Sequence, residues 1–229
     1  MRYFWRVISG DEISDVFYFD TEDTYPRPVR IDGVSNVRDL GGKTTDGRKI
    51  SQGLIYRGSE LNSNLNITDE GRKTMLETLK VKTVLDLRGG KEIVINAYGQ
   101  NYKNIPSLAY KEWLGQPEVA KEIFEFMFDE DIYPVYFHCA GGADRTGTLA
   151  FLLGAILGKS YEDLIDDYEF TTLSRFGARS RNDEEIFGIF YKTFDSFEGD
   201  TIKEKAETYF KSCGISDSAI EKFRKFMLR

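Results

Sequence analysis

The segment from Val135 to Gly158 constrains the fold most strongly, because it joins two apolar runs through a short loop of small residues. Val135-Tyr136-Phe137 is typical of a buried β-strand, and 145–157 is typical of a buried helix that ends at Gly158. Strands followed directly by helices are the repeating unit of α/β proteins, in which helices cover both faces of a parallel sheet. We therefore expect a central, mainly parallel sheet flanked by helices.

The chain beyond residue 29 keeps this alternation of strands and helices. Thr68 is a suitable N-cap for one helix, and Ser160 with Asp163 forms a capping box for another. Pro117 stands where helices tolerate proline, near the start of a third. Further strands are expected at 53–57 and 81–87, and helices at 69–79, 117–129, 203–211 and 217–228.

The first twenty residues have a different pattern. Aromatic and β-branched runs at 3–8 and 16–19 flank a Gly-containing turn, which predicts a β-hairpin, and a proline-containing linker follows at 24–28. The hairpin resembles the last hairpin of a fibronectin type III-like sandwich. We therefore divide the chain into residues 1–24, a remnant of such a domain, and 25–229. The alternative that the hairpin packs on the second domain stays open.

Composition excludes several classes of function. The 229 residues carry a net charge of −7, which argues against a nucleic-acid binder, and no run of eighteen apolar residues could span a membrane. His138 is the single histidine, whereas zinc hydrolases draw on several, so we expect no metal and no cofactor. Two cysteines form no disulfide framework. The chain as it stands favours the cytoplasm, while a longer native N-terminus could carry an export signal.

The loop between the strand and the helix has the composition of an anion site. Cys139 and Arg145 flank five residues, Ala140-Gly141-Gly142-Ala143-Asp144, which are small enough for successive N–H groups to turn inward around a phosphate. The helix N-terminus adds positive potential, and the guanidinium of Arg145 fits two phosphate oxygens. The same field stabilises the thiolate of Cys139, which is its nucleophilic form. The loop therefore predicts phosphate binding and covalent catalysis together.

The stretch HCAGGADRTG at 138–147 matches the HCxxGxxR[ST]G signature of the protein tyrosine phosphatase superfamily. NVRDLGG at 36–42 and LIYRG at 54–58 resemble the opening of bacterial tyrosine phosphatases with broad specificity. The resemblance implies hydrolysis of phosphate monoesters through a phosphocysteine, on a phosphorylated protein or peptide or a phosphoinositide. Relatives that act on phosphoinositides commonly carry Lys where this chain has Ala143, so phosphotyrosine is the preferred substrate.

The resemblance also implies roles for neighbouring residues. Asp144 would be the general acid that protonates the leaving oxygen, with Asp86 as competitor or helper. Thr146 would donate a hydrogen bond to the departing thiolate, and His138 would support the loop from behind.

Other parts of the chain also bear on the site. Arg38 and Asp39 are expected to brace the loop through an ion pair. The basic run in 172–182 is expected to be a solvated loop, with contact to a second phosphate or an acidic peptide as the alternative.

Two other functions compete with this interpretation. A rhodanese-like sulfurtransferase also places a cysteine loop between a strand and a helix, but the His-Cys pair and Arg-Thr-Gly speak against it. A catalytically inactive phosphate-binding module would typically have lost Cys139, Asp144 or Arg145, and all three are present.

Overall fold

A six-stranded sheet forms the centre of the chain in the computed structural model, which describes residues 2–20, 25–63, 65–89 and 100–229. The strand order is β11-β10-β12-β9-β6-β5; the first four strands are parallel, and β6 and β5 are antiparallel at one edge. The mainly parallel sheet expected from the sequence is therefore confirmed. The strands are β5 (Arg27–Pro28), β6 (Arg38–Asp39), β9 (Ile55–Gly58), β10 (Thr83–Asp86), β11 (Asn101–Asn104) and β12 (Val135–His138), with β7 (Gly42–Lys43) and β8 (Lys49–Ile50) forming a separate small ribbon.

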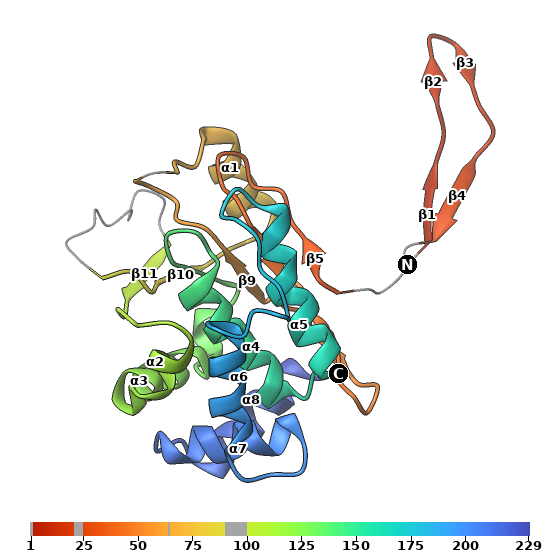
Figure 1. Cartoon of the computed structure of the whole chain (residues 1–229). Helices are drawn as coiled ribbons and strands as arrows, with labels where there is room; N and C mark the ends of the chain where they lie inside the picture. Colours follow the sequence, from red (N-terminus) through yellow and green to blue (C-terminus); the bar gives the residue numbers. More distant parts are fainter. Residues whose placement is uncertain (1, 21–24, 64, 90–99) are drawn as a thin grey trace.

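Helices cover the sheet, as Figure 1 shows. They are α1 (Asp69–Lys73), α2 (Tyr110–Leu114), α3 (Pro117–Met127), α4 (Asp144–Leu157), α5 (Tyr161–Phe170), α6 (Phe187–Asp195), α7 (Ile202–Ser212) and α8 (Asp217–Met227). No helix in the described ranges is long and apolar enough to cross a membrane.

Two hydrophobic cores lie on opposite faces of the sheet, because successive residues of a strand point to opposite sides. On β12, Val135 and Phe137 belong to the larger core, whereas Tyr136 belongs to the smaller one. On β10, Leu85 belongs to the larger core and Val84 to the smaller one. The larger core contains side chains of α3, α4, α7 and α8, and the smaller one lies beside α1. Both faces of β12 are therefore buried, which fixes the position of the loop that follows it.

Helix α4 is the buried helix that the sequence predicts. Eleven of its fourteen residues are buried, and Gly158 ends it with a φ of 89°, a value that favours glycine. The cap on α1 is also confirmed, since Thr68 accepts a hydrogen bond from the N–H of Gly71. The expected helix over 69–79 differs in detail, because it continues as a π-helical turn at Thr74–Thr78.

The N-terminal residues form the expected hairpin. β1 (Arg2–Trp5) pairs with β4 (Phe17–Asp20), and β2 (Ile8–Ser9) pairs with β3 (Glu12–Ile13) nearer the turn. All residues of β1 and β4 are exposed, and Figure 1 shows the hairpin outside the sheet and its helices. The division of the chain at residue 24 stays a prediction, and residues 1 and 21–24 lie outside the described ranges.

Candidate active site

The signature loop begins at the carboxyl end of the central strand. Cys139 directly follows β12, and α4 begins at Asp144, so the loop lies at a strand–helix junction as expected. Cys139 is buried, with an exposed fraction of 3%. The turn requires glycine at Gly142, whose φ is 64° and where an added Cβ would lie 2.3 Å from the carbonyl carbon of Gly58. The loop is thus packed closely against the end of the neighbouring strand β9.

The carbonyl groups of the loop point away from its interior. The oxygen of Ala140 accepts a hydrogen bond from the N–H of Glu60 at 3.0 Å. Nδ2 of Asn36 donates to the oxygens of Gly141 and Gly142, at 3.2 and 3.0 Å. In the described part of the chain, the N–H groups of these three loop residues have no acceptor. Carbonyls held outward leave the N–H groups for an anion, which is the geometry of a phosphate nest.

A buried ion-pair network supports the loop from the adjacent strands. Arg57 donates through Nη2 to the oxygen of Gly142 at 2.7 Å, and its Nη1 pairs with Asp167 of α5. Arg38 pairs through Nε with the other oxygen of Asp167 at 2.6 Å. The expected ion pair between Arg38 and Asp39 is wrong, because adjacent residues of a strand point to opposite faces. Asp39 instead accepts hydrogen bonds from backbone N–H groups of the chain that follows β6.

Asp167 is the charge at the centre of this network. Burial raises the pKa of its carboxyl, but the guanidinium groups of Arg38 and Arg57 outweigh that effect and hold the pKa well below its usual range. Sequence reasoning missed Asp167, since it stands in an acidic helix that has the pattern of a solvated face. Nothing in the pattern around it indicated that this carboxylate is buried.

Arg145 lies in the first turn of α4 and is partly buried. Its Nη1 donates to the carbonyl oxygen of Leu87 at 3.4 Å, a long contact that a phosphate oxygen could replace. Thr146 is fully buried, and its hydroxyl has no hydrogen-bond partner among the described residues. A buried donor without a partner is unusual, and it fits a group whose partner forms only during the reaction.

Asp144 projects into solvent beside the loop. Its side chain is 49% exposed. The hydroxyl of Tyr110 and Nη2 of Arg179 both donate to its Oδ1, each at 2.7 Å. Neither partner was expected from the sequence: Tyr110 stands in a helix that was not predicted, and Arg179 belongs to the expected solvated loop.

Asp86 has a different environment at the end of β10. It is fully buried, pairs with Arg88 at 2.7 Å, and accepts a hydrogen bond from the hydroxyl of Tyr102 at 2.8 Å. Burial raises the pKa of Asp86, but the hydrogen bonds from the side chain and the N–H of Arg88 lower it below its ordinary value. A carboxyl held in the charged form by these partners is a poor proton donor at neutral pH.

The ring of His138 contacts the backbone of the signature loop. Its Nδ1 lies 3.1 Å from the carbonyl oxygen of Cys139, and the ring is 2% exposed. Nε2 lies 3.8 Å from Asp86. Burial lowers the pKa of His138, so the ring is neutral and Nδ1 donates to the carbonyl. These contacts join His138 to the backbone of the loop, and its supporting role stays a prediction.

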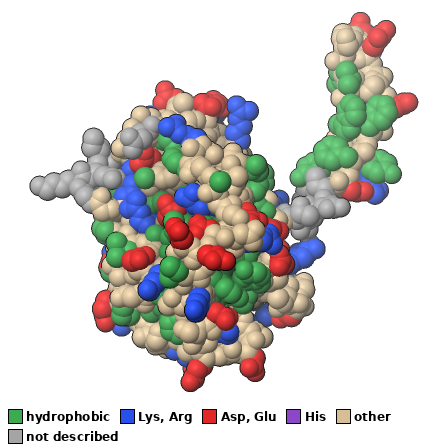
Figure 2. Space-filling view, viewed as in Figure 1, with side chains coloured by type: hydrophobic (Ala, Val, Ile, Leu, Met, Phe, Trp, Pro, Cys, Tyr) green, Lys and Arg blue, Asp and Glu red, His purple; other side chains and the backbone are tan. Residues whose placement is uncertain are grey.

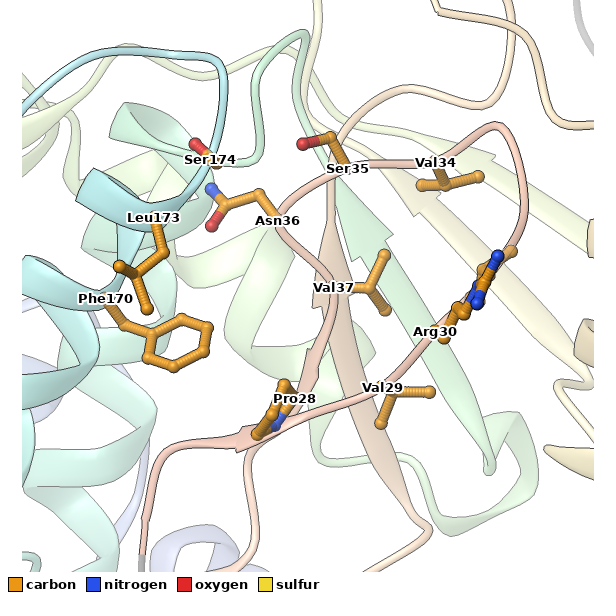
Figure 3. A pocket seen from close by; sticks show the side chains of 11 residues that line it. Pro28, Val29, Arg30, Val34, Ser35, Asn36, Val37, Phe170, Leu173 and Ser174 are labelled. Atoms are coloured by element: carbon orange, nitrogen blue, oxygen red, sulfur yellow. The ribbon is translucent and has the colours of Figure 1, made fainter.

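Other places where a ligand could bind lie outside the loop. A hollow of about 550 Å³ is lined by residues 28–31, 34–37, 170, 173 and 174. Figure 3 shows the side chains that line it. Asn36 borders it, but no residue of 139–145 lines it, so it is separate from the reaction centre. Within the described ranges no three His, Cys, Asp or Glu side chains group closely enough to hold a metal ion.

Comparison with known families gives one match that covers most of the chain. The sequence profile described as the tyrosine phosphatase family matches residues 29–229. A protein of Cupriavidus necator named among the tyrosine-protein phosphatases is 29% identical over 171 residues, 61% of each chain. A tyrosine-protein phosphatase of Nostoc commune is 28% identical over 102 residues, 44% of this chain and 34% of that protein. The matched regions thus span less than two thirds of these relatives' own length.

Solved structures with a related chain trace were also found. The core catalytic domain of the PP-IP phosphatase SIW14 from S. cerevisiae has a TM-score of 0.48 and 19% identity, over 69% of this chain and 90% of that one. TpbA of P. aeruginosa has a TM-score of 0.41 and 16% identity, over 79% of this chain and 89% of that one.

Proposed function

This chain belongs to the tyrosine phosphatase family, and on that premise we propose that it hydrolyses phosphate monoesters through a phosphocysteine formed on Cys139. Phosphotyrosine in a protein or peptide is the preferred substrate, with phosphoserine and phosphothreonine as further substrates. A phosphoinositide is the second candidate, and Ala143 in the loop disfavours it because no lysine adds charge there. The sulfurtransferase and the inactive module receive no support from the family match.

The observation that carries the proposal is the direction of the loop backbone. The carbonyls of residues 140–142 are hydrogen-bonded outward by Asn36, Arg57 and the N–H of Glu60. The N–H groups and the guanidinium of Arg145 remain to bind three phosphate oxygens beside Cys139.

In the first step the thiolate of Cys139 attacks phosphorus, and the bond from phosphorus to the leaving oxygen breaks. Asp144 gives its proton to that oxygen, which leaves as a neutral phenol. Inward N–H groups and Arg145 stabilise the charge that develops on the equatorial oxygens. This step leaves phosphocysteine and the ionised Asp144.

In the second step water attacks phosphorus, the bond between sulfur and phosphorus breaks, and Asp144 takes the proton from the water. The thiolate is the leaving group of this step, and Thr146 is proposed to donate to it. Its buried hydroxyl without a partner supports that role. Asp86 orders the end of β10 through Arg88 and transfers no proton in this scheme.

The test is a Cys139→Ser variant compared with the parent chain on an aryl phosphate, in excess chelator. We expect the parent to turn over and vanadate to inhibit it, since vanadate mimics the trigonal-bipyramidal transition state. The variant should bind phosphate ligands without turnover, because the loop does not ionise a serine hydroxyl. Activity that requires a divalent ion, or turnover by the variant, would contradict the proposed function.

A further inference from the structure

The proposed general acid is held by two donors that converge on one oxygen. The hydroxyl of Tyr110 and Nη2 of Arg179 each lie 2.7 Å from Oδ1 of Asp144. In the described part of the chain, Oδ2 has no hydrogen-bond partner. The side chain of Arg179 is 18% exposed and that of Asp144 is 49% exposed, so the pair lies at the rim of the site. The arrangement leaves Oδ2 as the oxygen that can carry the transferable proton.

Tyr110 is a fixed donor. Its side chain is 8% exposed, and its ring packs edge-on against Tyr168 and Phe190. Its N–H donates to the hydroxyl of Thr148, one turn along α4 from Asp144, at 2.8 Å. Tyr110 has a φ of 53°, a strained value for a non-glycine residue that persists where the surroundings impose it. Burial and the nearby Asp144 raise the pKa of Tyr110, so it stays a phenol that donates to the carboxylate.

Arg179, in contrast, belongs to a surface loop that also touches the phosphate loop. Hydrogen bonds in both directions join its backbone to the hydroxyl of Thr172, at 2.9 and 3.0 Å, and close the loop on itself. Phe176 of the same loop packs against Gly141, where an added Cβ would lie 3.0 Å from the ring. The loop therefore presents an aromatic ring beside the phosphate nest and a cation beside the proposed acid.

The ion pair and the acid role of Asp144 oppose each other. A general acid must carry its proton when the leaving oxygen departs. The guanidinium of Arg179 instead makes a charge-assisted hydrogen bond to Oδ1 at 2.7 Å, a contact that requires the carboxylate. Arg179 must therefore change partner before the first step, and only another anion can replace the carboxylate at a similar free energy.

We propose that Arg179 exchanges Asp144 for a carboxylate of the substrate, next to the phosphotyrosine, and so releases Asp144 to take up its proton. This inference rests on the proposed function and deepens it, because it assigns a preference for acidic phosphopeptides. The proton comes from solvent to Oδ2 and passes to the leaving oxygen. Arg179 is a positioning residue, since it acts through Asp144 and touches no reacting atom.

An acidic peptide fits this loop better than a phosphoinositide does. The ring of Phe176 packs against Gly141 of the nest, so it suits the aryl group of a phosphotyrosine that leaves the nest. Arg181 of the same loop is already paired with three carboxylates of α5, Glu162, Asp166 and Glu169. Among the described residues Arg179 has a single carboxylate partner, so it is the guanidinium that a substrate anion can recruit with least disruption.

The test compares the parent chain with Arg179→Gln on two phosphotyrosine peptides, one with acidic flanks and one with neutral flanks. A hydrogen bond between charged groups corresponds to roughly tenfold or more in affinity, so the parent should prefer the acidic peptide in kcat/KM by about that factor. Arg179→Gln should lose the preference, and Arg179→Lys should restore part of it. On the neutral peptide, the limb of the pH profile that needs the protonated acid should move to higher pH in Arg179→Gln.

The matched control is Arg175→Gln, which removes a charge from the same loop. Within the described ranges Arg175 has no carboxylate partner, and its guanidinium lies 5.8 Å from the Phe176 ring. The control should keep the acidic preference and the parent pH profile. The inference would be overturned if both variants lost the acidic preference equally, or if Arg179→Gln kept it. It would also be overturned if the parent chain preferred a phosphoinositide in vesicles. Absence of turnover on every aryl phosphate would instead contradict the proposed function.

Discussion

Asp144 and Asp86 differ in what surrounds their carboxylates, and that difference supports the proposed choice of Asp144 as general acid. Asp86 is fully buried and bound by Arg88 and Tyr102, all within the protein. Asp144 is half exposed, and its Oδ2 has no hydrogen-bond partner among the described residues. From the sequence alone both residues were candidates, since each stands near the carboxyl end of a buried strand. The family resemblance favours Asp144, and the arrangement of the side chains supports the same choice.

Asp144→Asn should slow substrates with poor leaving groups far more than activated ones. General acid catalysis contributes roughly a hundred- to ten-thousandfold, and an activated leaving group needs no proton. The measurement is kcat for a series of aryl phosphates of increasing leaving-group basicity. Asp86→Asn is the control, and we expect its dependence on leaving group to match that of the parent. The reverse result would assign the acid role to Asp86.

At the scale of the elements, α5 is joined to the loop through a single buried carboxylate. Asp167 pairs with Arg57 of β9, which donates to Gly142 of the loop, and with Arg38 of β6. One helix and two strands thus meet at one charge. Removal of one partner of a buried ion pair leaves the remaining charges buried without compensation. The resulting loss of folding stability is larger than the stability that the intact pair contributes.

Asp167→Asn should lower the free energy of unfolding at pH 7 by about 3 kcal/mol, because two guanidinium groups stay buried without their charge partner. The pKa of Asp167 is lower in the folded chain than in the unfolded one, so its contribution is present above about pH 4 and is lost as the pH falls below that. The variant should therefore lose stability less steeply than the parent on acidification.

Denaturant titrations between pH 3 and pH 7 measure both effects. Asp166→Asn is the control, since Asp166 stands next to Asp167 on α5 but is 48% exposed and pairs with the exposed Arg181. Exposed pairs contribute about 0 to 1 kcal/mol. If Asp167→Asn lowers the free energy of unfolding no more than Asp166→Asn does, the buried network does not stabilise the fold.

The elements that could be predicted from sequence are those with a clear apolar pattern or cap. β12, α4 and the Thr68 cap belong to this group. Strand β6 could not be predicted, because it consists of Arg38 and Asp39, two charged residues without an apolar pattern. Their burial depends on partners far along the chain, such as Asp167.

The same limit applies to the candidate site. The residues of the signature loop could be predicted, since their spacing is itself the signal. The partners of Asp144 could not, because Tyr110 and Arg179 stand 34 and 35 residues away from it, on opposite sides along the chain. Short α2, which carries Tyr110, has no cap with a side-chain hydrogen bond that would have marked its start.

At the scale of the whole molecule, the hairpin contributes little to the burial of the rest. Its aromatic side chains pair within the hairpin, as Trp5 with Phe17 at 5.0 Å and Tyr3 with Phe19 at 5.4 Å between ring centroids. All four remain about half exposed, and Figure 2 shows hydrophobic side chains along the projecting hairpin. The family match begins at residue 29, after the hairpin.

Deletion of residues 1–24 should leave a chain that folds and hydrolyses phosphate esters with kcat/KM close to that of the parent. The reason is that neither hydrophobic core contains a residue of the hairpin. Thermal unfolding and aryl phosphate turnover of the two chains provide the comparison. An insoluble or inactive product would show that the hairpin is an integral part of the catalytic domain.

The two cores of unequal size have a consequence for the motions of the protein. β12 is enclosed by both, whereas α1 and its π-helical turn lie beside the smaller core alone. Local opening of that side exposes few apolar side chains, so it is less costly than opening of the side that contains α4. We therefore expect β12 and α4, which flank the loop with Cys139, to belong to the part of the chain that is most costly to open. Fluctuations of the α1 face can occur while the nucleophile stays in register with the nest.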